Sequence, residues 1–140
     1  MAAQPIVYIE FPASDPKAAG AFYGDVFGWQ IETPSGFDDY PQFRAEGGPS
    51  GAFTRIGGGL DGVRYAAGEP LIYVASQDID ADLQRVEAQG GQTVLPKTEI
   101  PHVGWWAVFR DPSGNKVGLF HRTGRIAPRS DPPAATEATA

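Results

Sequence analysis

Few side chains in this sequence could do chemistry, and Glu10 is the sharpest candidate among them. It lies in a β-rich run, Ile6–Phe11, where alternate residues would face the same way on a strand. Tyr8 and Glu10 would then share a face. A carboxylate enclosed by aromatic side chains holds a proton more tightly than one in water, which suits a general base. The alternative is a structural Glu10 that hydrogen-bonds nearby backbone or Tyr8, and both interpretations remain open.

The two histidines, His102 and His121, are the other candidates for acid–base or metal chemistry. His102 lies in a proline-containing loop, whereas His121 ends the last apolar run and would face opposite to Phe120. We therefore expect two surface residues with no shared task. His102 is the better functional candidate of the two, because loops often cover binding sites. Cysteine is absent, which excludes disulfides, thiolate catalysis and cysteine metal sites.

Composition and charge exclude several classes of function. The net charge is -6 and the pI about 4.7, so the chain has no basic stripe with which to bind a nucleic acid. No run approaches the roughly 20 apolar residues of a membrane-spanning helix. The N-terminus has no basic segment followed by an apolar one, as a signal peptide would. We therefore expect a cytoplasmic protein without nucleic-acid or membrane partners.

The elements that must position these residues occur in the same order twice. Asp15 and Pro16 predict the start of a helix that ends at Gly28. Asp78 predicts a second helix that ends at Gly90–Gly91. Predicted strands precede and follow each helix, at residues 6–11, 29–33, 40–45 and 50–56 in the first half and 71–74, 92–95, 104–110 and 116–121 in the second.

The landmarks of the two halves match at nearly constant offsets. Asp15 with Asp78 and Gly28 with Gly91 are each 63 residues apart, and the match of Gly51 with Gly118 is at 67. Duplication explains this better than chance, and it predicts an α+β fold of two βαβββ modules. The predicted organisation is one domain over residues 1–122, with module one at about 5–56, a linker at about 57–69, module two at about 70–121 and a disordered tail at 123–140.

Two segments resemble the vicinal oxygen chelate superfamily, which includes glyoxalase I, bleomycin-resistance proteins and extradiol dioxygenases. They are IEFPASDPKAAGAFYGDVFGW, from Ile9 to Trp29, and GWWAVFRDPSGNKVGLF, from Gly104 to Phe120. The resemblance implies that the paired modules form an open barrel around a shared concave cleft. It also implies, in metal-using members, a divalent ion held by residues of the first and last strands of each module.

In this chain the four implied metal positions fall on residues that are not ordinary ligands. Counting back from the helix caps places the first-strand positions at Tyr8 and Leu71, and the last-strand positions fall on Gly51 and Gly118. A phenol ligates only as phenolate, and the other three have no donor side chain. The resemblance therefore predicts no cofactor here, with a divalent metal left open only through displaced ligands.

These observations favour a protein that binds a small organic molecule in the cleft, whether or not it is an enzyme. The expected binding residues are Tyr8, Glu10, Leu71, Tyr73, Trp106 and Phe120, with Glu10 as the catalytic candidate. One alternative is a metal-dependent lyase, isomerase or dioxygenase that uses displaced ligands among Glu10, His102 and His121. Another is a non-enzymatic protein that sequesters a drug or metabolite as a homodimer.

Overall fold

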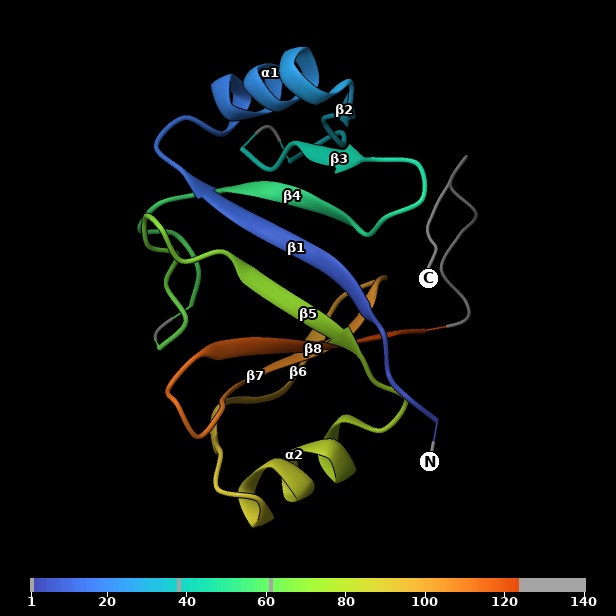
Figure 1. Cartoon of the computed structure of the whole chain (residues 1–140), viewed down its shortest axis with the longest axis vertical. Coiled ribbons are helices and arrows are strands. Elements are labelled where there is room, and N and C mark those ends of the chain that lie inside the picture. Colours follow the sequence, from blue (N-terminus) through green and yellow to red (C-terminus); the bar gives the residue numbers. More distant parts are fainter. Residues whose placement is uncertain (1, 38, 61, 124–140) are drawn as a thin grey trace. The chain divides into compact units, whose positions relative to one another are not determined.

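The computed structural model describes residues 2–37, 39–60 and 62–123. Their elements are β1 (Ile6–Ala13), α1 (Pro16–Phe27), β2 (Gln30–Glu32), β3 (Gln42–Arg44), β4 (Ser50–Arg55), β5 (Leu71–Ala75), α2 (Ile79–Ala88), β6 (Gln92–Ile100), β7 (Gly104–Arg110) and β8 (Lys116–Arg122) (Figure 1). The predicted order βαβββ therefore occurs twice, in an α+β fold. The predicted disordered tail, apart from Thr123, lies outside the described residues.

The chain divides into two compact units. The first unit is Tyr8–Leu71, and the second unit consists of the described residues of Met1–Val7 and Ile72–Ala140. The start of β1 thus belongs by its contacts to the second unit, where the Pro5 carbonyl accepts a hydrogen bond from the Ala75 N–H at 2.9 Å. No helix in the described part of the chain is long and apolar enough to cross a membrane.

In the first unit, α1 begins and ends where the sequence predicts. The Asp15 carboxylate accepts a hydrogen bond from the Ala18 N–H at 3.2 Å, and Pro16 occupies the first turn. Gly28 closes the helix in the left-handed conformation, with φ of 75°. These local signals depend on neighbouring residues only, which is why the sequence alone reveals them.

The first unit's strands run in the order β2-β3-β4-β1, with β1 parallel to β4 and the other pairs antiparallel. One face packs against α1 through stacked aromatic rings. The ring of Phe11 lies 5.4 Å from that of Tyr23 on α1, and Trp29 lies 4.4 Å from Phe43, both measured between ring centroids. Side chains alternate along a strand, so Glu10 belongs to the opposite face, as predicted.

In the second unit the order is β5-β8-β7-β6, again with the first and last strands of the module parallel. Asp78 caps α2, and an aliphatic core joins the helix to the sheet through Ile79, Leu83, Ala107 and Leu119. Strand β6 continues to Ile100, well beyond its predicted end. It contains two register shifts around Pro96, a residue that sheets tolerate at such irregularities because it has no N–H to donate.

The strand register corrects one correspondence between the modules. Tyr73 pairs with Gly118, and its counterpart Glu10 pairs with Ala52. Ala52, not Gly51, is therefore the equivalent of Gly118. Gly51 pairs with Ile9 and belongs to the face toward α1. The sequence match was wrong by one residue, and a shift of one residue exchanges the two faces of a strand.

Candidate functional site

The first unit buries Glu10 on the face of its sheet that is turned away from α1. Glu10 is almost completely buried, with only 3% of its surface exposed to solvent. One carboxylate oxygen, Oε2, accepts a hydrogen bond from the Tyr40 hydroxyl at 2.6 Å. The other, Oε1, accepts from the Tyr65 hydroxyl at 2.9 Å. Hydrogen bonds to a charged acceptor contribute about 1.5–3 kcal/mol each, so the two phenols help to offset the burial of this carboxylate.

The phenol partners of Glu10 come from two loops. Tyr40 directly precedes Pro41, which favours an extended backbone, and the Pro41 carbonyl accepts from the Phe53 N–H at 2.9 Å. This bond extends the β3–β4 pairing, and alternation then turns Tyr40 to the same face as Gln42 on β3. Tyr40 thereby reaches Glu10 although it lies outside a regular strand.

Tyr65 is held by a closed turn in the segment that joins the modules. Its N–H donates to the Gly58 carbonyl at 3.0 Å, and its carbonyl accepts from the Gly57 N–H at 2.7 Å. Arg64 Nη1 adds bonds to the carbonyls of Gly57 and Gly59, at 3.2 and 3.1 Å. The predicted linker therefore contains a structured turn that presents a phenol to the first unit.

Tyr8 joins the same cluster through Tyr40. The two phenol oxygens are 2.9 Å apart, and Gln42 Nε2 donates to the Tyr8 oxygen at 3.5 Å. A phenol has one hydrogen to donate. Because Tyr40 donates its hydrogen to Glu10, Tyr8 is the donor in the Tyr8–Tyr40 bond. The hydrogen bonds therefore run from Gln42 through Tyr8 and Tyr40 to Glu10, and from Tyr65 to Glu10. We call Tyr8, Glu10, Tyr40, Gln42 and Tyr65 the tyrosine–glutamate cluster.

The predicted binding residues of module two form an aromatic face in the second unit. Trp106 pairs with Phe120, and its ring lies 6.2 Å from that of Tyr73, centroid to centroid. Neighbouring Val74 and Trp105 pack against the core beside α2, so this face is turned away from that helix, as predicted. Leu71 is buried at the start of β5 and belongs to the first unit. The predicted set is thus divided between the two units.

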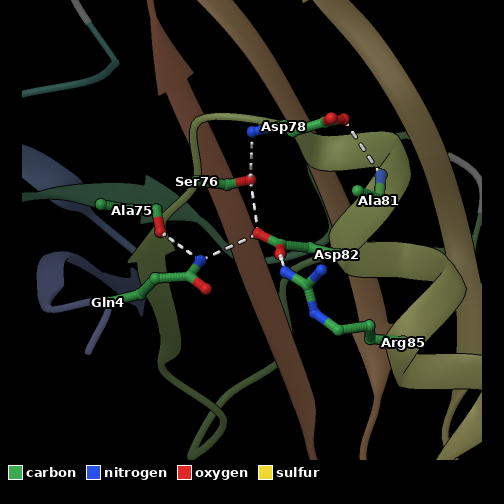
Figure 2. Close-up of polar contacts among 7 residues, drawn as sticks. All are labelled: Gln4, Ala75, Ser76, Asp78, Ala81, Asp82 and Arg85. Atoms are coloured by element: carbon green, nitrogen blue, oxygen red, sulfur yellow. Dashed lines mark hydrogen bonds and ion pairs between the residues drawn. The ribbon is translucent and has the colours of Figure 1, made fainter. Parts of the chain in front are cut away.

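A second buried acid, Asp82, lies on α2 and is engaged by the fold around it (Figure 2). Its Oδ2 accepts from Ser76 Oγ at 2.6 Å and from Gln4 Nε2 at 2.8 Å, and its Oδ1 accepts from Arg85. Gln4 also donates to the Ala75 carbonyl at 2.8 Å. This network fastens the N-terminal segment and the end of β5 to the first turns of α2.

His121 lies on β8, and His102 lies in the loop between β6 and β7. His121 Nδ1 is 2.8 Å from the Ser76 carbonyl, a contact with the main chain. His102 is exposed and has a positive φ of 67°. No contact between the two is described, and a functional role for either stays a prediction.

The side chains at the positions implied for a metal do not fit a divalent ion. Tyr8 is hydrogen-bonded as a phenol, and Leu71 and Ala52 offer no donor. A Cβ at Gly118 would lie 2.5 Å from the Tyr73 ring, so that ring fills the space of a ligand side chain. Among residues 2–37, 39–60 and 62–123, no three His, Asp or Glu side chains are grouped to hold a metal ion.

Comparison with known proteins agrees with this architecture. Residues 7–120 match the family model described as a glyoxalase-like domain. The structure superposes on a glyoxalase/bleomycin resistance protein/dioxygenase superfamily member from Vibrio splendidus with a TM-score of 0.59 and 16% identity, covering 85% of this chain and 99% of that one. The fold is therefore the one implied by the vicinal oxygen chelate resemblance. The chain belongs to the glyoxalase-like domain family.

Two curated relatives show how much of a longer protein the chain resembles. It is 29% identical to CFP32 of Mycobacterium tuberculosis over 85% of this chain and 46% of that protein. It is 31% identical to the anthracycline biosynthesis protein DauV of Streptomyces sp. (strain C5) over 82% of this chain and 46% of DauV. The chain thus spans about half the length of these relatives.

Proposed function

We propose that this glyoxalase-like protein binds a small, partly apolar organic molecule on the sheet face that carries the tyrosine–glutamate cluster. The observation that carries the proposal is the buried Glu10 carboxylate with phenol donors on both oxygens. Small-molecule sites typically combine aromatic walls with a few fixed polar groups. The half-buried rings of Tyr8, Tyr40 and Tyr65 provide that combination around Glu10.

The proposed site works without a resident divalent ion. The residues at the implied metal positions support this, because they provide one phenol and no carboxylate or imidazole. DauV, a relative named for anthracycline biosynthesis, supports an organic ligand. If the bound molecule is also turned over, Glu10 is the group that takes a proton from it, and Tyr40 and Tyr65 hold the carboxylate in place.

A screen of small aromatic fragments by ligand-observed NMR tests the proposal on the full chain. We expect a subset of fragments to bind saturably, and Glu10→Gln to weaken most of them by about tenfold or more, since one charged acceptor is lost. Glu46→Gln is the matched control, because Glu46 is an exposed turn residue and the net charge changes equally. An absence of hits, or equal binding by wild type and Glu10→Gln, would contradict the proposal.

Two further measurements separate the alternatives. Elemental analysis of protein purified without chelators distinguishes the metal-free site from a metalloenzyme. Stoichiometric zinc, nickel, iron or manganese that is lost in Glu10→Gln or in a histidine variant would favour displaced ligands. Product analysis after incubation with each bound fragment distinguishes an enzyme from a sequestering protein, because only an enzyme changes the fragment. The homodimer stays a prediction, which sedimentation of the full chain tests.

A further inference from the structure

The helix α1 presents a second apolar side to solvent. Its first side packs on the sheet, where Tyr23 stacks on the ring of Phe53. On the side away from the sheet, four exposed residues share one face at spacings of three and four residues, and we call them the α1 stripe: Ala18, Ala21, Phe22 and Val26. Phe22 and Val26 are each more than half exposed. A helix that is apolar on both sides is normally covered on both, so the α1 stripe calls for a partner.

The equivalent face of α2 is polar. The caps Asp15 and Asp78 are 63 residues apart, which aligns the two helices residue by residue. The residues of α2 at the positions of Ala21, Phe22 and Val26 are all polar and exposed. They are Gln84, Arg85 and Gln89. The shared framework therefore does not require an apolar surface at this place, and the α1 stripe needs a cause of its own.

The two charged residues of α1 oppose the dipole of their own helix. Lys17 lies in the first turn and Asp25 in the last, although a helix N-terminus favours anions and a C-terminus favours cations. The helix α2 follows this preference, with Asp80 and Asp82 in its first turn and Arg85 in its last. In the part of the chain that the structure describes, neither Lys17 nor Asp25 has an ion-pair partner. Opposite charges on a partner would make both placements favourable.

A second α1 helix running antiparallel meets both requirements. If the two helices cross on a two-fold axis between Ala21 and Phe22, Lys17 of each copy lies beside Asp25 of the other. The small residues of one stripe then face the large residues of the other, because the small ones come first in the helix and the large ones last. Self-complementarity of this kind is what a two-fold contact between identical subunits needs. A parallel pair would instead place like charges together.

From these observations we propose that two copies of this chain associate through their α1 helices, as an antiparallel pair that buries the α1 stripe. This association is independent of the proposed ligand site, which lies on the sheet face away from α1. A membrane surface fits the stripe less well, because Lys17 is the only basic residue of α1 and membrane-surface helices are rich in Lys and Arg. Two 12-residue helices make a small interface, so the dimer should be weak.

Sedimentation velocity of the full chain from about 5 to about 500 µM tests the proposal, because mass action populates a weak dimer only at high concentration. We expect the sedimentation coefficient of the wild type to rise with concentration, and Phe22→Gln/Val26→Gln to stay monomeric throughout. Gln favours a helix at least as well as Phe or Val, so this variant should fold. Phe37→Gln is the control, because Phe37 lies outside α1 and is 61% exposed, against 58% for Phe22.

Charge reversal tests the antiparallel arrangement itself. At about 50 mM salt, where exposed charges are little screened, Lys17→Glu should weaken the association severalfold. The double reversal Lys17→Glu/Asp25→Lys should restore it, because each pair of opposite charges is recreated. Both reversals suit the helix dipole, so neither should unfold α1. A wild type that is monomeric at every concentration, an equal loss in Phe37→Gln, or a double reversal that fails to recover would overturn the proposal.

Discussion

Among the residues that the structure describes, each unit buries one acid, and the two acids have different surroundings. In the second unit, Asp82 lies on α2 and is bound by Ser76, Gln4 and Arg85, which are all parts of the framework around that helix. In the first unit, Glu10 lies on the sheet face away from the helix, and its phenol partners come from loops. Asp82 thus stabilises the fold, whereas Glu10 belongs to the sheet face on which we propose that a ligand binds.

The residues that occupy the equivalent positions in the other module are not acids. Tyr73 occupies on β5 the position that Glu10 has on β1, and Ala19 of α1 corresponds to Asp82 of α2. Module one has therefore no buried acid on its helix, and module two has none at that position of its first strand. The two modules share the βαβββ order, yet the sheet face away from the helix carries a buried acid in one and aromatic rings in the other.

The largest expected effect comes from removing the structural acid. Asp82→Ala leaves Ser76 and Gln4 without their acceptor and Arg85 without its ion pair, so unfolding should become easier by about 3 kcal/mol. This is the lower end for a buried pair, because Arg85 is half exposed. Urea unfolding measures the change. Asp80→Ala on the same helix should cost about 0.3–1 kcal/mol, the contribution of an exposed acid to the helix dipole.

Ligand binding completes this comparison of the two acids. Asp82→Ala should leave the affinity for 1-naphthalenemethanol, a small aromatic fragment, unchanged wherever the variant is still folded, whereas Glu10→Gln should lower it. Equal effects of the two variants on affinity would remove the distinction between a structural and a functional acid.

A smaller loss of stability is expected when a Cβ is added to either of two closely packed glycines, Gly51 on β4 and Gly118 on β8. A Cβ at Gly51 would lie 1.9 Å from the Ile9 carbonyl oxygen, which is backbone, whereas the atoms nearest to a Cβ at Gly118 belong to the Tyr73 ring. Gly118→Ala should therefore destabilise the chain by about 1 kcal/mol, and Gly51→Ala by about 2 kcal/mol, because backbone yields less than a side-chain ring. Gly48→Ala is the control, because no atom lies within 4 Å of its added Cβ.

The Gly118 result also tests whether Tyr73 fills the implied ligand position. Replacing Tyr73 with Leu in the Gly118→Ala background should restore part of the lost stability, since the clashing ring is removed. An additive loss in the double variant would mean that the ring is not the obstacle.

The smallest expected effect is on the stability of the fold at low pH, and it arises from two carboxylates of the second unit. The Thr93 N–H, bound at 2.7 Å, lowers the pKa of Glu87, and the Asn115 side chain lowers the pKa of Asp111. A carboxyl with a lowered folded-state pKa stabilises the fold above its ordinary pKa, here 4.5 and 3.8, and this contribution disappears as the pH falls through the lowered value. The Glu87→Gln/Asp111→Asn variant should therefore lose less stability than wild type on acidification.

Urea midpoints of the wild type and of the double variant, measured from about pH 6 down to about pH 2.5, show how steeply the stability of each falls with pH. Glu87 is exposed and Asp111 is half-buried at the surface, so only a modest difference between the two curves is expected. Parallel curves would show that these hydrogen bonds add nothing to acid stability.

The sequence predicted those features that depend on short segments. The helix limits at Asp15 and Gly28, the duplicated order and the faces of β1 and β5 all follow from caps and alternation, which neighbouring residues determine. The shared face of Tyr8 and Glu10 was therefore predicted. Their connection through Tyr40 was not, because Tyr40 reaches them only after β3 pairs with β4.

The misses share a physical cause, which is that they depend on contacts distant in sequence. Tyr65 lies in a turn without periodicity, and nothing in its neighbourhood indicates a bond to Glu10. A signal for Tyr40 did exist: it alternates with Gln42, and a pairing of β3 with β4 would have turned both toward Glu10. The match of Gly51 with Gly118 followed residue type alone, and the strand register, which depends on pairing between distant segments, makes Ala52 the counterpart instead.

Amide chemical-shift mapping of the full chain shows whether a ligand binds at the tyrosine–glutamate cluster. On titration with 1-naphthalenemethanol, the largest shifts should occur at Tyr8, Glu10, Tyr40 and Tyr65, with little change at Ser76 and Asp82. Shifts centred on Asp82, or scattered over both units without saturation, would contradict ligand binding at Glu10.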